Sequence, residues 1–69
     1  MIITSYRTQH PNNGAEIWKR LFPTMAEAQA WADWAIGRID DNDRTVTYID
    51  LFDSETLTSQ DYYLQGAED

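Results

Sequence analysis

Residues 22–35, FPTMAEAQAWADWA, decide the fold of this chain because they contain a clear helix start. Thr24 is of the type that caps the first free amides of a helix, and Glu27, three residues later, can bond back to the Thr24 amide in a capping box. The alanines that follow favour continuation of the helix. We expect the helix to extend through Ala35 at least and to end at Gly37 or in the acidic residues that follow it.

The predicted helix has one apolar face. At 100° per residue this face contains Met25, Ala28, Trp31, Ala32, Ala35, Ile36 and Ile39. Trp34 lies about 60° away from Trp31 around the helix, so it is the aromatic residue most suited to contact a partner. The alternative is that Arg38, four residues on, stacks over Trp34 and that Trp34 roofs the edge of the core.

Strands are expected on both sides of this helix. Runs rich in β-branched and aromatic residues predict strands at residues 2–8, 15–22, 44–52 and 57–64. Tight turns are predicted at Asn13-Gly14 and at residues 53–56. The fold class is therefore α+β: one small domain over residues 1–69, with an antiparallel sheet of three to four strands, one helix packed on one face and the order β-β-α-β-β. Residues 65–69 read as a frayed acidic tail.

Both faces of the predicted sheet are apolar. Alternation along the strands places Ile17, Leu21, Ile49 and Leu51 on one side of their strands and Trp18, Phe22, Tyr48 and Phe52 on the other. One helix covers only one face, so the other face is available to another chain. The sequence leaves open which face that is.

Negative charge is concentrated in the second half of the chain. The net charge is −7, and residues 39–69 carry nine acidic side chains against the single cation of Arg44. Such a surface repels nucleic acids and anionic membranes, whose binding depends on cationic side chains. It steers a basic protein surface towards the chain, although simple solubility is the alternative explanation.

The residues for most enzyme classes are missing. The chain has no Cys, its one histidine, His10, lies in a predicted turn, and its three glycines are isolated. No catalytic triad, phosphate-binding loop or nucleotide motif can be assembled from them. Read as a calcium loop starting at Asp41, the acidic cluster has Val46 and Phe52 where Gly and Glu are required. We therefore expect no enzymatic activity, no cofactor and no metal.

The N-terminal residues 1–5 lack both a basic segment and a long apolar run. They are therefore interpreted as neither a signal peptide nor a membrane span, and a cytoplasmic location is expected.

The short acidic chain, the β-β-α-β-β order and the helix start of residues 22–35 together resemble small phage- or prophage-encoded inhibitor proteins, including anti-CRISPR and other host-takeover proteins. The resemblance is one of overall pattern. It implies an inhibitor in the host cytoplasm that docks on a nucleic-acid-handling complex and fills its basic groove with carboxylates, as a mimic of nucleic acid.

The leading prediction is a non-enzymatic protein that binds a basic surface of a host protein complex. Its predicted contact residues are Asp40, Asp41, Asp43, Asp50, Asp53, Glu55 and Trp34. Carboxylates would set association rate and register, and exposed rings would supply most of the affinity. The alternative is a self-associating structural or regulatory domain, a homodimer formed through the open sheet face.

Overall fold

The computed structural model describes residues 1–64, and the predicted acidic tail at residues 65–69 lies outside the described residues. The elements are β1 (Ile2–His10), β2 (Gly14–Phe22), α1 (Met25–Ala35), β3 (Thr45–Asp53) and β4 (Thr58–Tyr63). The four strands form one antiparallel sheet in the order β2-β1-β3-β4. The predicted α+β class and the order β-β-α-β-β are confirmed. Within residues 1–64, no helix has the length and apolar character needed to cross a bilayer.

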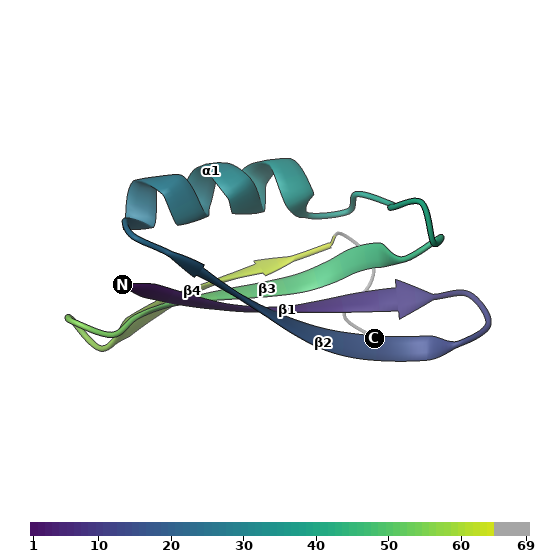
Figure 1. The fold of residues 1–69 in the computed structure, drawn as a ribbon, viewed down its shortest axis with the longest axis horizontal. Helices are drawn as coiled ribbons and strands as arrows, with labels where there is room; N and C mark the ends of the chain where they lie inside the picture. The colour runs from purple at the N-terminus through teal and green to yellow at the C-terminus, as the bar shows by residue number, and fades with distance from the viewer. Residues whose placement is uncertain (65–69) are drawn as a thin grey trace.

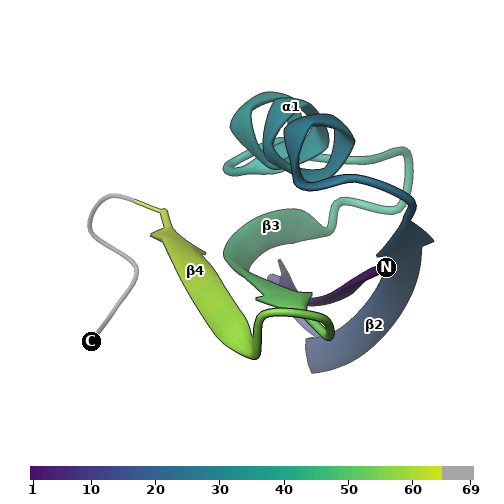
Figure 2. The ribbon, with the colours of Figure 1, turned by 90° about the vertical axis from the view of Figure 1, so that its left-hand side faces the viewer.

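The helix lies above one face of a twisted sheet (Figure 1). Seen from the end, α1 sits over the two central strands, and the edge strands β2 and β4 curve away on either side (Figure 2). The covered face and the helix enclose a core of six buried apolar residues: Ile2, Ala28, Ala32, Ala35, Ile49 and Leu51. Alanine on the helix side allows the helix to approach the sheet closely.

The strand register decides which side chains share a face. Residues that lie opposite each other in an antiparallel pair point to the same side of the sheet. Ile2 pairs with Phe22 of β2, and Tyr6 pairs with both Trp18 of β2 and Ile49 of β3. The face below the helix therefore takes aromatic residues from β2 and aliphatic residues from β3. The predicted alternation is correct within each strand, but each face is a mixture of the two predicted sets.

The helix begins and ends at specific side chains. Thr24 Oγ1 accepts the Glu27 amide at 3.2 Å, and the Glu27 carboxylate accepts the Thr24 hydroxyl at 3.2 Å. At the other end Gly37 has φ +80°, and a Cβ there would lie 2.9 Å from Leu64 Cδ1. The chain leaves the helical path at this point. The prediction that Ile39 belongs to the core stripe is wrong, because Ile39 lies past the helix end and is exposed.

Enlarging a buried alanine should push the helix off the sheet. We expect Ala32→Leu to lower the free energy of unfolding by about 1–3 kcal/mol, since extra methylenes strain a packed core. The matched control is Ala30→Leu, on the exposed side of the same helix, which should change stability by less than about 0.5 kcal/mol. Urea unfolding followed by circular dichroism measures both. Equal effects at the two positions would contradict the close helix contact.

Thr4 carries a buried hydroxyl in the centre of the covered face. The residue is fully buried, and its Oγ1 has no hydrogen-bond partner among residues 1–64. An unpaired buried hydroxyl costs stability. We expect Thr4→Val to raise the free energy of unfolding by about 1–2 kcal/mol. Thr4→Ser, which keeps the hydroxyl and loses the methyl group, should lower it in the same unfolding assay.

Candidate functional site

An aromatic groove of about 440 Å³ opens between α1, the first two strands and the loop that follows the helix. We call it the tryptophan groove because all three tryptophans of the chain line it. Its lining residues are Tyr6, Thr8, Trp18, Arg20, Trp31, Trp34, Ala35, Arg38, Ile39, Asp40, Asp41, Arg44 and Val46. This volume lies within the range of small-ligand and peptide-side-chain pockets, about 300–1,000 Å³.

Trp31 forms the inner wall of the tryptophan groove. Its ring meets Tyr6 of β1 edge to face, with centroids 5.0 Å apart, and lies 5.6 Å from the ring of Phe22. The Arg20 guanidinium stands 5.3 Å from the centroids of both Phe22 and Trp31. Ring contacts on two sides hold Trp31 in one orientation, so this wall is preformed.

Trp34 lies at the rim and is 57% exposed. The Arg38 guanidinium stacks 4.1 Å from its ring centroid, and Arg38 Nε donates to the Trp34 carbonyl at 3.1 Å. The predicted stacking of Arg38 is thus present, and Trp34 still keeps more than half of its surface open. The cation fixes the indole in place, which reduces the entropy that a partner must overcome on binding.

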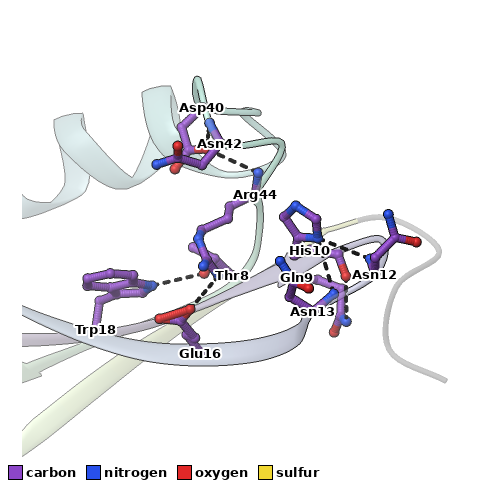
Figure 3. A network of polar contacts seen from close by, with 10 residues as sticks. All are labelled: Thr8, Gln9, His10, Asn12, Asn13, Glu16, Trp18, Asp40, Asn42 and Arg44. Atoms are coloured by element: carbon purple, nitrogen blue, oxygen red, sulfur yellow. Dashed lines mark hydrogen bonds and ion pairs between the residues drawn. The ribbon is translucent and has the colours of Figure 1, made fainter.

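Trp18 forms the opposite wall. It is 41% exposed, and its indole N–H donates to the buried Thr8 hydroxyl at 2.9 Å (Figure 3). Beside it, the Arg44 guanidinium reaches across to Glu16 of β2, with Nη1 and Oε1 2.6 Å apart (Figure 3). This half-buried ion pair ties the start of β3 to the edge strand and closes one end of the groove.

The loop after the helix is held by Asp40. Its Oδ1 accepts the amides of Arg44 at 3.0 Å and of Asn42 at 2.8 Å (Figure 3). These backbone hydrogen bonds, that of Arg44 first, hold the pKa of the Asp40 carboxyl below its ordinary value. Asp40 is therefore a structural residue of the loop. Asp41 is the other carboxylate of the groove lining, and it makes no hydrogen bond or ion pair within residues 1–64.

The charges around the tryptophan groove balance. Three guanidiniums, those of Arg20, Arg38 and Arg44, face the carboxylates of Asp40 and Asp41 and the Glu16 carboxylate that pairs with Arg44. Arg20 and Arg38 form no ion pair within the described part of the chain and lie on aromatic rings instead. The groove is locally neutral within a protein of net charge −7.

The predicted contact carboxylates do not share one surface. Asp40, Asp41 and Asp43 lie in the loop before β3, while Asp53 and Glu55 lie at the far end of this nine-residue strand, about 27 Å away. Figure 1 shows these two loops at opposite ends of the molecule. Asp50 points to the open sheet face between them. Of the predicted set, the structure brings Trp34 together with Asp40 and Asp41 alone.

Asp53 and Glu55 have local partners at the β3–β4 turn. Asp53 Oδ1 accepts the Glu55 amide at 2.9 Å and the Thr56 amide at 3.4 Å, and the first of these bonds is the main cause of a lowered pKa for Asp53. The Glu55 carboxylate lies 3.4 Å from the Met1 ammonium. Both side chains thus stabilise the turn and its contact with the N-terminus.

His10 is the last residue of β1 and holds the turn between β1 and β2. Its Nδ1 accepts the amides of Asn12 at 3.0 Å and Asn13 at 3.1 Å (Figure 3), so the ring proton resides on Nε2. Among residues 1–64, no three His, Asp or Glu side chains gather in a way that could hold a metal ion.

Sequence reasoning missed the tryptophan groove itself. Trp18 and Arg20 are separated from Trp31 by a turn and a helix cap, and only the pairing of Tyr6 with Trp18 brings them beside the helix. The one local signal was the four-residue spacing of Trp34 and Arg38, which predicted their stacking.

Comparisons of the chain with protein-family models, curated proteins and solved structures found no match.

Asp50 allows a test of the electrostatics on the sheet face opposite α1. Burial and its neighbour Asp61 raise the pKa of Asp50 above the ordinary value of 3.8. A raised native pKa means that ionising Asp50 above pH 3.8 costs folding free energy. We expect Asp50→Asn to raise the melting temperature at pH 7, with the gain disappearing as the pH falls to 3.8. Calorimetry over this pH range measures it.

The control for Asp50→Asn is Asp53→Ala on the same strand, because the pKa of Asp53 is lowered. Its carboxylate contributes stability above pH 3.8 that is lost as the pH falls through the lower native pKa. Asp53→Ala should therefore lower the melting temperature at pH 7. Shifts of the same sign for both variants would contradict the assigned environments.

Proposed function

We propose that this protein is a non-enzymatic binding module whose tryptophan groove receives an apolar or aromatic segment of another protein, flanked by basic residues. The observation that carries the proposal is the convergence of three tryptophans on one groove, with Trp18 and Trp34 left substantially exposed. Indole rings are over-represented among the residues that dominate binding energy.

The groove supplies affinity because its walls are already ordered. Trp31 is held by Tyr6 and Phe22, and Trp34 by Arg38. A segment that enters displaces water from these rings without first ordering them. Because the groove itself is neutral, its interior suits an uncharged apolar side chain.

Charge supplies the direction of the encounter. The net charge of −7 attracts a cationic partner over several ångströms. Asp41 and Asp43 are both exposed and lie in the loop at the entrance of the groove. These carboxylates support contact with Lys or Arg residues that flank the bound segment. Within this proposal the partner is a basic surface of a nucleic-acid-binding protein, since such surfaces carry clustered cations, and binding there makes the protein an inhibitor.

A display library of random peptides tests the proposal directly. We expect selection on this protein to enrich peptides with an aromatic or aliphatic centre and flanking Lys or Arg. For an enriched peptide, Trp34→Ala should cost about 2 kcal/mol of binding free energy or more. The matched control is Tyr63→Ala, an aromatic residue of similar exposure on the opposite face, which should leave peptide affinity unchanged. Isothermal titration calorimetry measures both.

The carboxylates are tested by Asp41→Asn combined with Asp43→Asn. Asn tolerates the left-handed backbone of Asp43, where φ is 60°. The pair should slow peptide association and flatten its salt dependence. Asp33→Asn with Glu55→Gln removes the same charge elsewhere and serves as the control. Enrichment of acidic peptides, or full affinity after Trp34→Ala, would contradict the proposal.

A further inference from the structure

The sheet face opposite α1 is covered by no described element (Figures 1 and 2). The register arranges its side chains in three rows that run across the strands from β2 to β4. The rows are Leu21, Ile3, Phe52 and Ser59; then Lys19, Ser5, Asp50 and Asp61; then Ile17, Arg7, Tyr48 and Tyr63. We call this surface the open face. Its two outer rows are mainly apolar, and its middle row is charged.

The middle row is polarised from one edge of the sheet to the other. Lys19 stands on β2 and has no ion pair within residues 1–64, while Asp50 and Asp61 stand side by side on β3 and β4. Asp61 also accepts the Tyr48 hydroxyl at 3.1 Å. Partial burial and this acidic neighbour raise the pKa of Tyr48 to about 12. Negative charge at the β4 edge is thus uncompensated, and so is positive charge at the β2 edge.

We propose that the open face pairs with the open face of a second copy of this chain. The two copies are related by a two-fold axis that lies in the interface, parallel to the strands and midway between β1 and β3. This rotation keeps each row in place and reverses its direction, so that β2 of one copy lies over β4 of the other. Lys19 then meets Asp61 of the second copy, and the reciprocal contact follows from the symmetry.

Four of the remaining opposed pairs are complementary as well, while Leu21 meets Ser59 at the edge of the face. Ser5 meets Asp50 and can donate its hydroxyl to that carboxylate. Arg7 meets the ring of Tyr48, an arrangement suited to a cation–π contact. Ile3 meets Phe52, and the apolar residues at the ends of the third row, Ile17 and Tyr63, also meet.

Charge selects this axis over the other face-to-face arrangement. A two-fold axis that crosses the strands would place each strand over itself. Lys19 would then face Lys19, and the two aspartates of the middle row would face their own copies. Like charges in contact are strongly unfavourable, so Lys19, Asp50 and Asp61 exclude this arrangement.

The size of the open face sets the strength of the dimer. Four strands about 4.8 Å apart and about 27 Å long present roughly 500 Å² per copy, or about 1,000 Å² in total. That is the lower limit for specific interfaces. We therefore expect a weak dimer, with a dissociation constant on the order of micromolar. The tryptophan groove lies on the helix side of the sheet, so a dimer leaves both grooves accessible, and this inference does not depend on the proposed function.

Sedimentation velocity from about 1 µM to about 1 mM tests the proposal with charge reversals. The wild-type chain should show a monomer–dimer equilibrium, and Lys19→Glu or Asp61→Lys should each raise the dissociation constant by about tenfold or more. The double variant Lys19→Glu with Asp61→Lys restores unlike charges and should dimerise as the wild type does. An equimolar mixture of the two single variants should form a heterodimer. A wild-type chain that stays monomeric, or a double variant as weak as the singles, overturns the proposal.

An apolar pair of variants keeps the test decisive if a charge reversal unfolds the chain. Ile17→Lys places a charge in the third row, opposite Tyr63 of the second copy, and should abolish dimerisation, since Ile17 is 65% exposed and free to make this contact. Leu57→Lys changes a leucine that is 74% exposed in the β3–β4 turn, outside the open face, and should leave dimerisation intact. Near-ultraviolet circular dichroism establishes that both variants are folded. Undiminished dimerisation of folded Ile17→Lys overturns the proposal.

Discussion

The contact between the alanine face of α1 and the aliphatic centre of the sheet is the constraint from which the rest of the structure follows. Ala28, Ala32 and Ala35 bury completely, so there is no room for a large ring beneath the helix axis. Trp31 is displaced sideways, to the gap between the helix and β2, where Tyr6 supports it. A chain without disulfides thus obtains its core from small side chains, and its indoles border a groove.

The sequence predicted every element because the decisive signals are local. Thr24 and Glu27 lie three residues apart, and the strand segments are continuous runs of β-branched and aromatic residues. The composition of the faces could not be predicted, because it depends on pairing between segments far apart in the chain. A bulge between Arg7 and Thr8 also shifts the β1–β3 register, and no local pattern marks it.

The carboxylates illustrate a second limit of prediction from composition. Asp40 and Asp53 each accept two backbone amides and so hold the loops before and after β3. Asp41 has no such bond within the described residues, although it is identical in kind and adjacent in sequence. Whether an aspartate bonds backbone amides or stays free depends on the path of its own loop. Composition alone therefore does not show which aspartates hold a loop together.

The β2-β1-β3-β4 order gives the molecule a two-part folding architecture. Each outer pair of strands is a hairpin closed by a short turn, whereas β1 and β3 meet only after some forty intervening residues have been brought together. Hairpins form within microseconds, and distant pairing carries a larger loop-closure entropy. We therefore expect the pairing of β1 with β3 to be the last step of assembly. In the folded protein, the amides that pair β1 with β3 should then exchange their hydrogens only through global unfolding.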